Sequence, residues 1–288
     1  MSRRLLLLIA VVTLCACQTQ AAKVAFTDPP RDPAHPARLE VLHIPSAGVE
    51  INGVAYLASG PGAHPTLVLC HGWPGNEKNL DLAQGVRRAG WNAITFNYRG
   101  SWGSAGEFRF SQVPEDAEAV LAWLRRPEVA AKLGVDTHRI VIAGHSMGGW
   151  ATAIAAAADS TLLGAILIAP ADMGAHGKLP RADLVKLTSE NMETLVTSPE
   201  KMADELSEHS NDFALTRTAP GLAKIPLLVL TADDGLAPKA DALVAAIWAQ
   251  GGTRVQTLHF TTDHGWSDSR LALQSKIIEW LQALPKAM

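Results

Sequence analysis

The chain of 288 residues is predicted to form an α/β fold, with a mostly parallel central sheet and helices on both faces of it. Three observations predict this class. From residue 66 onward, short and almost wholly apolar runs alternate with longer helical patterns. The apolar runs lack the polar alternation of a half-exposed strand, as expected for strands covered on both faces. The composition, 48% hydrophobic and 18% charged, suits a globular domain with a substantial core.

The elements follow in order along the chain. Alternating apolar and polar residues at 38–57 predict an antiparallel pair of strands at the edge of the sheet, turning near residues 46–48. Later strands are predicted at residues 66–70, 92–97, 140–143, 163–169, 227–231 and 254–260. Helices are predicted at residues 79–89, 115–125, from 150 onward, 236–250 and 269–284. Because a right-handed crossover through a helix joins parallel strands, this alternation predicts a parallel sheet.

Residues 172–224 interrupt the alternation with two helical patterns rich in Leu and Met. The first holds Leu184 and Met192, and the second starts at Ser198-Pro199, an N-cap followed by a first-turn proline. Two interpretations stay open for this short helical insertion. It is a lid over an acyl-binding pocket, or a pair of helices that pack on the surface of the domain.

The N-terminus is interpreted as a targeting segment. Arg3 and Arg4 precede an uncharged run at residues 5–14, which is too short to span a bilayer. The next residues, Leu14-Cys15-Ala16-Cys17, resemble the lipobox of bacterial lipoproteins. The resemblance implies a signal peptide at residues 1–16 and a lipid anchor on Cys17. The alternative is an ordinary secretory signal that is cut after Ala22.

The chain after the signal divides into a tether and a domain. Residues 17–37 are polar and rich in proline, which predicts a tether, and residues 38–288 form the folded domain. Gln18 after the lipidated position implies, by the habit of lipoproteins, the outer membrane over the inner. The predicted location is therefore the bacterial cell envelope, facing the periplasm, with a soluble periplasmic or secreted protein as the alternative. The membrane is then a partner through the lipid anchor.

Charge and cysteine content narrow the possible partners. The net charge of −3 offers no basic field for nucleic acid. Cys70 is the one cysteine outside the targeting segment, so no internal disulfide framework is expected. Since Cys70 ends an apolar run, a buried and unreactive thiol is predicted there. The sequence does not indicate an oligomeric state.

The most informative stretch is residues 140–150, where a buried strand is predicted to turn sharply into a helix. Gly144, Ser146 and Gly148 lie at the turn with the spacing Gly-x-Ser-x-Gly. At such a turn the apex residue adopts a strained backbone conformation, and side chains two positions away on either side would collide. The turn exposes the Ser146 hydroxyl at the start of a helix, where backbone N–H groups favour negative charge.

A nucleophilic serine also needs a base and an orienting acid. His264 follows the last predicted strand, so its loop should leave the same edge of the sheet as Ser146. His145 is adjacent to the serine and is interpreted as a packing or supporting residue. For the acid, Asp234 follows the strand at residues 227–231 and is preferred over Asp233 and Asp172, both of which stay possible.

A developing oxyanion needs two hydrogen-bond donors. The predicted donors are the backbone N–H groups of Trp73, in His71-Gly72-Trp73-Pro74-Gly75, and of Met147, the residue after the serine. His71 is interpreted as a structural hydrogen-bonding residue of this turn rather than as a base.

Together these motifs resemble the α/β-hydrolase superfamily, and most closely its esterase, lysophospholipase and serine-aminopeptidase branch. Gly-His-Ser-Met-Gly-Gly and His-Gly-Trp-Pro-Gly carry the resemblance, and residues 97–106 add a third block. The resemblance implies an α/β-hydrolase fold with Ser146 as nucleophile, Asp234 as acid and His264 as base. Serine at the turn disfavours the dehalogenases and epoxide hydrolases of this fold, which carry aspartate there.

The predicted function is therefore a serine hydrolase that acts on a small acyl substrate, cleaving a carboxylic ester rather than an amide. Three alternatives remain: a peptidase or aminopeptidase, a binding protein of the envelope without catalysis, and a lyase or C–C hydrolase. The sequence lacks His-Glu-x-x-His, the Walker A motif and Gly-x-Gly-x-x-Gly. No cofactor and no metal are predicted.

Overall fold

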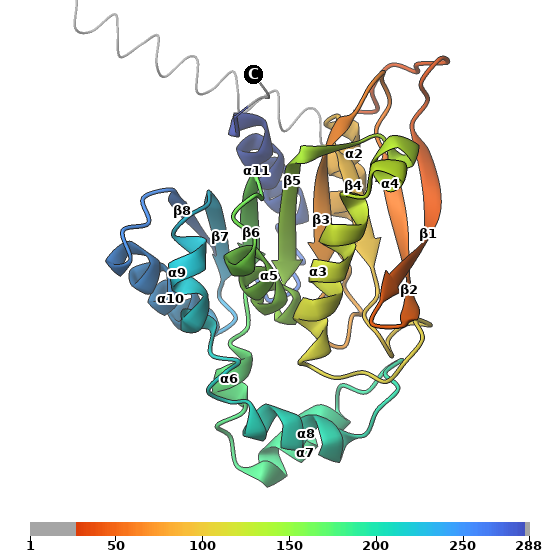
Figure 1. The fold of residues 1–288 in the computed structure, drawn as a ribbon. Helices are drawn as coiled ribbons and strands as arrows, with labels where there is room; N and C mark the ends of the chain where they lie inside the picture. The colour runs from red at the N-terminus through yellow and green to blue at the C-terminus, as the bar shows by residue number, and fades with distance from the viewer. Residues whose placement is uncertain (1–26, 286–288) are drawn as a thin grey trace, which may run out of the picture.

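The central sheet has eight strands in the order β1-β2-β4-β3-β5-β6-β7-β8 (Figure 1). The computed structural model describes residues 27–285, so the predicted signal peptide, Cys17 and the start of the tether lie outside the described residues. The strands are β1 Arg38–Ser46, β2 Val49–Leu57, β3 His64–Cys70, β4 Asn92–Phe96, β5 Val135–His145, β6 Gly164–Ile168, β7 Leu227–Ala232 and β8 Val255–Phe260.

The sheet is parallel except at one edge. β1 and β2 form an antiparallel hairpin, and β2 also pairs antiparallel with β4. The turn residues Ala47 and Gly48 both have positive φ, 45° and 85°, which is the geometry of a tight hairpin. All remaining neighbours, from β4 through β8, are parallel. The prediction of a mostly parallel sheet with an antiparallel edge is confirmed.

Helices cover both faces of the sheet. They are α2 Leu80–Arg88, α3 Gln112–Leu124, α5 Met147–Ala158, α10 Ala237–Ala249 and α11 Arg270–Ala283. Side chains of β5 alternate between the faces: Val141 belongs to the buried cluster that holds the apolar residues of α2 and α11, and Ile142 to the cluster of α3, α5 and α10. Both faces of the central strands are therefore buried, which is why these strands read as continuous apolar runs.

The insertion between β6 and β7 consists of short helices: α6 Met173–His176, α7 Arg181–Ser189, α8 Pro199–Glu208, the 3-10 helix η1 Leu215–Thr218 and α9 Ala219–Leu222. α6, α7 and α8 lie beyond the carboxyl ends of the parallel strands (Figure 1). Ser198 caps α8 by accepting a hydrogen bond from Lys201 N at 3.3 Å. The first predicted pattern ends earlier than expected, because α7 stops at Ser189 and Met192 follows it.

Two elements differ from the sequence prediction. An additional helix, α4 Pro127–Leu133, precedes β5, and β5 begins at Val135 rather than near residue 140. The helix follows ordinary rules: Pro127 is its first residue, and Gly134 ends it in a left-handed conformation with φ of 62°. Its sequence has too few apolar positions to show a clear helical period, since Leu133 is its one buried residue.

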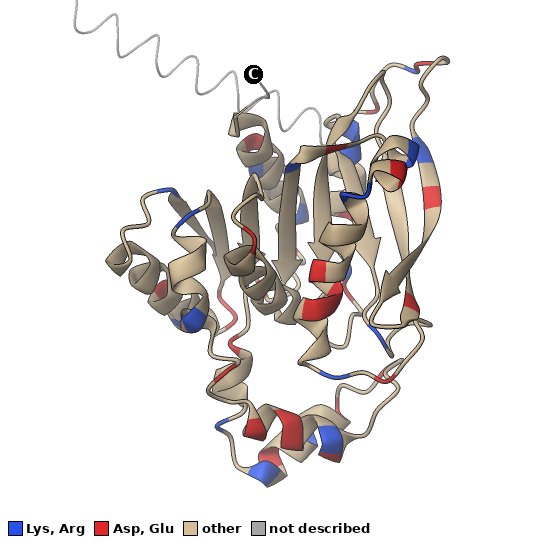
Figure 2. Ribbon diagram, viewed as in Figure 1, with Lys and Arg blue, Asp and Glu red and all other residues tan. Residues whose placement is uncertain are grey.

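Charged residues are concentrated on some elements and absent from others. Figure 2 shows both signs gathered on α7 and α8, whereas β6 and β7 carry neither. On these helices Arg181 Nε lies 2.7 Å from Asp204 Oδ1, in a pair that is exposed to solvent. Within residues 27–285, no helix is both long enough and apolar enough to cross a membrane.

Candidate active site

The candidate nucleophile lies at a strained turn between β5 and α5. Ser146 has φ of 58° and ψ of −122°, a conformation that side-chain-bearing residues rarely adopt. A Cβ atom on Gly144 would lie 2.0 Å from the Gly148 carbonyl oxygen, and one on Gly148 would lie 2.2 Å from the Cys70 carbonyl oxygen. Neither glycine can therefore carry a side chain while the turn keeps this shape.

A histidine and an aspartate are joined at the same edge of the sheet. His264, after β8, has its Nδ1 atom 2.7 Å from Oδ2 of Asp234, after β7. The Asp234 side chain is 4% exposed, and its Oδ1 accepts a hydrogen bond from the backbone N–H of Leu236 at 2.9 Å. Because both oxygens of Asp234 are engaged, its carboxylate can orient the imidazole and leave Nε2 of His264 available as a proton acceptor.

The two other acidic candidates have different partners. Asp233 Oδ1 lies 3.0 Å from Nε2 of His259, in a pair that is about half exposed. Asp172 caps α6: its Oδ1 accepts from Ala175 N at 3.1 Å and from Leu215 N at 3.2 Å. Of the three carboxylates, Asp234 alone bonds to His264 among the residues that the structure describes.

The loop after β3 lies against the candidate nucleophile. A Cβ atom on Gly72 would be 3.2 Å from Cβ of Ser146, so the backbone before Trp73 approaches the serine closely. Over the described range, the backbone N–H groups of Trp73 and Met147 donate no hydrogen bond within the chain. Both are thus free to donate to an oxygen bound beside Ser146.

Buried hydrogen bonds fix this loop. The Tyr98 hydroxyl donates to the His71 carbonyl oxygen at 2.9 Å, and His71 Nδ1 lies 2.7 Å from the Gly72 carbonyl oxygen. Burial lowers the pKa of His71 to about 4, so this imidazole is neutral at neutral pH. The structural role expected for His71 agrees with these contacts.

The insertion reaches the site through its connecting segment. The indole N–H of Trp73 donates to the Asn191 carbonyl oxygen at 2.9 Å. Ser101 and Leu195 form an antiparallel bridge between the loop after β4 and the segment that joins α7 to α8. Sequence patterns gave no signal for these contacts, because they join backbone carbonyls and amides across distant parts of the chain.

A groove of about 750 Å³ opens beside the His264 loop. Its lining includes Lys78, Trp102, Gly265 and Arg270. The Lys78 ammonium lies 3.9 Å from the centre of the Trp102 ring and donates to Asn97 Oδ1 at 2.8 Å. Glu77 and Asp81 line it as well, so the groove offers an aromatic surface together with charged groups of both signs.

Two other kinds of chemistry, a reactive cysteine and a bound metal ion, find no support in the described residues. Cys70 is 1% exposed, and burial raises the pKa of its thiol to about 12, so it is not a thiolate at neutral pH. Across residues 27–285, no group of three His, Cys, Asp or Glu side chains is arranged to hold a metal ion.

Comparison with solved structures gives the same fold. A thermophilic carboxylesterase cloned from a metagenomic library is 23% identical, with 94% of this chain and 96% of that chain covered and a TM-score of 0.64. The esterase from Pyrobaculum calidifontis is 21% identical, with 92% and 90% covered and a TM-score of 0.63. The acylaminoacyl peptidase from Pyrococcus horikoshii is 17% identical and has a TM-score of 0.67, with 88% of this chain and 42% of that one covered.

These likenesses show a shared fold. Among curated proteins, no match to this chain was found. Residues 67–284 match the family described as "Alpha/beta hydrolase family", and this range contains the strained serine turn, Asp234 and His264. The chain belongs to the alpha/beta hydrolase family.

Proposed function

We propose that this protein is a serine hydrolase that cleaves a carboxylic ester through an acyl-enzyme on Ser146. The observation that carries the proposal is the 2.7 Å hydrogen bond between His264 and Asp234, at the edge of the sheet where the strained turn presents Ser146. Esterases among the structural neighbours support the ester class.

The reaction uses two transfers of the acyl group. His264 Nε2 takes the proton of the Ser146 hydroxyl as the serine oxygen attacks the ester carbonyl carbon. The oxyanion of the tetrahedral intermediate accepts hydrogen bonds from the N–H groups of Trp73 and Met147. When the intermediate collapses, the C–O bond to the alcohol breaks and His264 returns the proton to that alcohol. A water molecule then repeats the sequence on the acyl-enzyme, releasing the acid and restoring the serine.

The leaving group lies on the His264 side in this mechanism, because His264 protonates it. The groove beside Gly265, lined also by Lys78, Trp102 and Arg270, adjoins that side. Its charged and aromatic lining suits a polar alcohol more than a long apolar chain. We therefore expect esters with polar leaving groups to be better substrates than esters of long-chain alcohols.

The chain offers a matched test of the triad. Ser146→Ala should lower kcat for a p-nitrophenyl ester by about a million-fold, and Asp234→Asn by about ten-thousand-fold. The neighbouring His–Asp pair, changed by Asp233→Asn or His259→Gln, should leave kcat within about twofold. Steady-state kinetics and labelling with a fluorophosphonate probe, followed by peptide mapping, measure these effects. Full hydrolysis by the Ser146→Ala variant, or labelling at another residue, would contradict the assignment.

A peptidase is the second candidate, because an acylaminoacyl peptidase has the same fold. Esters and amides can both be cleaved through an acyl-enzyme. The two substrate classes differ in the leaving group, so the fit of the leaving group decides which of them the protein hydrolyses. Assays with p-nitrophenyl esters of graded acyl length beside aminoacyl anilides separate the two activities. Turnover of anilides at rates equal to or above those of the esters would replace the esterase proposal.

We further propose that the protein is a lipoprotein of the bacterial cell envelope, anchored through Cys17 and facing the periplasm. The lipobox-like sequence Leu14-Cys15-Ala16-Cys17 supports this proposal. Labelled palmitate should be incorporated into the expressed full chain and into a Cys15→Ser variant, but not into a Cys17→Ser variant. No incorporation into the parent chain would leave the ordinary secretory signal as the better account, and incorporation that survives the Cys17→Ser change would contradict Cys17 as the anchor.

A further inference from the structure

We propose that His145 is a positioning residue that keeps the candidate base, His264, aligned with Ser146 at the turn between β5 and α5. This inference rests on the proposed function, because it assigns a supporting role within the same site. It goes further in giving a task to a side chain that the triad does not use.

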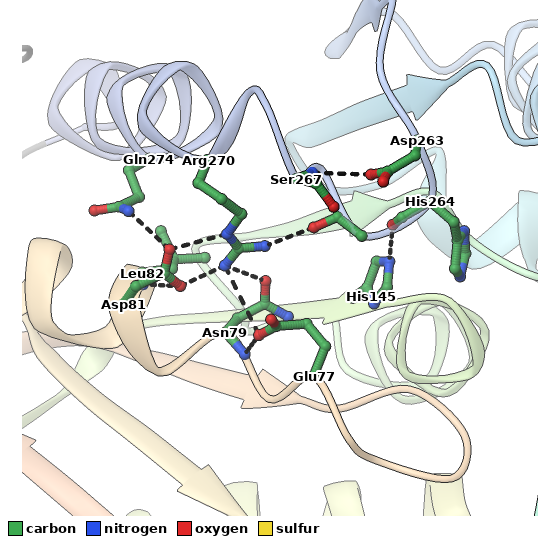
Figure 3. A network of polar contacts seen from close by, with 11 residues as sticks. Glu77, Asn79, Asp81, Leu82, His145, Asp263, His264, Ser267, Arg270 and Gln274 are labelled. Atoms are coloured by element: carbon green, nitrogen blue, oxygen red, sulfur yellow. Dashed lines mark hydrogen bonds and ion pairs between the residues drawn. The ribbon is translucent and has the colours of Figure 1, made fainter.

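The contact that carries the inference joins the two histidines. His145 is the last residue of β5 and directly precedes Ser146. Its Nε2 atom lies 2.8 Å from the backbone carbonyl oxygen of His264, as Figure 3 shows. The two rings also face each other, with centres 4.5 Å apart and planes inclined at 39°. The bond therefore ties the main chain of the base to the residue beside the nucleophile.

The chemistry of the two atoms fixes the direction of this hydrogen bond. A carbonyl oxygen only accepts, so Nε2 of His145 must carry the proton. His145 is 5% exposed, and its burial, together with the nearby His264, lowers its pKa to about 4. The other charged groups that face it are Arg270 and Asp234. At neutral pH His145 is thus a neutral donor, and adds no charge beside the base.

The second nitrogen of His145 lies against the loop after β3, which carries Trp73. Nδ1 is buried and has no hydrogen-bond partner. A Cβ atom on Gly72 would lie 3.6 Å from this Nδ1 and 3.3 Å from the His145 carbonyl oxygen. The imidazole therefore lies between the loop that holds Trp73 and the loop that holds His264. One side chain contacts both loops that must be aligned with Ser146.

The far side of the His264 loop is fixed by a separate set of contacts. Arg270, at the start of α11, donates to the Gly265 carbonyl oxygen at 3.4 Å. The guanidinium is itself held by Asp81, Glu77 and Asn79, and this network leads away from His145 in Figure 3. His145 thus supplies the contact on the side of the loop that faces the nucleophile turn.

The expected consequence is a loss of orientation rather than of chemistry. Without the bond from His145, the His264 ring keeps its Asp234 partner but its backbone is free to shift. A displacement of about 1 Å in a catalytic group costs roughly 100-fold in rate. Because the shift affects the proton transfer and not the fit of the substrate, kcat should fall while KM stays nearly constant.

Two substitutions separate the hydrogen bond from the bulk of the ring. The amide nitrogen of Gln lies near the position of histidine Nε2, and that of Asn near Nδ1, so His145→Gln keeps the donor and His145→Asn removes it. We expect kcat of His145→Gln to stay within about threefold of the parent, and kcat of His145→Asn to fall between about 10- and 100-fold. Thermal unfolding of both variants shows whether each retains its fold at the assay temperature.

His64 provides a matched control at the opposite edge of the sheet. Its Nδ1 lies 3.1 Å from the Gly90 carbonyl oxygen and its Nε2 3.2 Å from the Gly60 carbonyl oxygen, so it also bridges backbone groups. His64→Gln and His64→Asn should alter stability and leave kcat unchanged. If His145→Asn behaves like the His64 variants, with lower stability and parental kcat, the inference is wrong.

A measurement without substrate keeps this inference separate from the proposed function. The proton on His264 Nδ1, shared with Asp234, should give a far-downfield proton NMR signal that persists in Ser146→Ala and His145→Gln. In folded His145→Asn it should shift or broaden, because the ring is no longer held in one position. An unchanged signal in His145→Asn overturns the inference even if no ester is hydrolysed. Hydrolysis that persists in Ser146→Ala overturns the proposed function alone.

Discussion

At the scale of single residues, the two glycines around Ser146 have different neighbours but the same constraint. Backbone carbonyl oxygens, which cannot move aside as a flexible side chain can, occupy the space of a Cβ atom at both positions. This explains why the spacing Gly-x-Ser-x-Gly was readable in the sequence: the steric requirement is local, and it acts on residue types directly.

Gly148→Ala should therefore be strongly destabilising. The added methyl carbon would lie 2.2 Å from the Cys70 carbonyl oxygen, so β3 and α5 must separate or the serine turn must change shape. We expect a loss of about 3 kcal/mol or more in the free energy of unfolding, measured in urea. Gly48→Ala is the control, since its φ is 85° but no atom lies within 4 Å of the added carbon. It should cost only about 1–2 kcal/mol, and an equal loss for both variants would contradict the steric argument.

At the scale of elements, the order of strands and helices followed from the sequence, whereas their lengths and attachments did not. The parallel strands were readable because both faces are covered and the runs stay apolar. α4 was missed because one buried residue gives no period. In the insertion, α8 was readable from the Ser198 cap, while the end of α7 at Ser189 was not.

Backbone hydrogen bonds join the insertion to the loop after β4. Trp102 N donates to the Thr194 carbonyl oxygen at 3.1 Å, and Val196 N donates to the Gly100 carbonyl oxygen at 2.8 Å. These bonds flank the bridge between Ser101 and Leu195, so the two side chains form a closely spaced cross-strand pair. The arrangement favours fixed packing over a lid that opens at this point.

A disulfide between these positions tests that interpretation. In a Ser101→Cys, Leu195→Cys variant, the short Cα separation of such a pair permits the bond to form with little backbone movement. We expect the oxidised and reduced forms of this variant to hydrolyse esters at rates within about twofold of each other. The cross-link would connect the loop after β4 to the segment between α7 and α8, which backbone hydrogen bonds already join. Cys70 is buried and should not interfere. A rate that collapses on oxidation and returns on reduction would show that the segment must move during turnover.

At the scale of the whole molecule, one topological fact brings the candidate groups together. β3, β5, β7 and β8 run parallel, so the loops that carry Trp73, Ser146, Asp234 and His264 all leave the same edge of the sheet. This meeting was predictable from strand order. The position of Asp234 in the chain favours it over Asp233 and Asp172, whereas the hydrogen bonds that distinguish the three carboxylates depend on geometry that the sequence does not carry.

Stability of the whole domain should fall in mild acid, because two buried histidines resist protonation. Burial lowers the pKa of both His71 and His145 from 6.5 to about 4. Well above pH 6.5 neither state binds these protons and the contribution is complete. Between pH 6.5 and about 4 the unfolded chain binds protons that the folded chain does not, so stability is lost as pH falls. The loss is about 3 kcal/mol for each histidine across this window.

Unfolding in urea at a series of pH values measures this effect. The slope of stability against pH should be clearly shallower in His145→Gln than in the parent, because one of these buried histidines is gone. His43→Gln, at a side chain that points outward from β1, should keep the full slope. A parent profile that is flat from pH 7 to 4.5 would contradict the prediction.

The position of the insertion has a consequence for how proteins of this architecture can diversify. It leaves from the end of β6 and returns to the start of β7, its neighbour in the sheet, so its length and composition can change while every strand pairing is preserved. Exchange of this segment between relatives would thus replace the residues that surround the substrate in one step. The residues that cleave the bond, which lie on other loops, would stay in place.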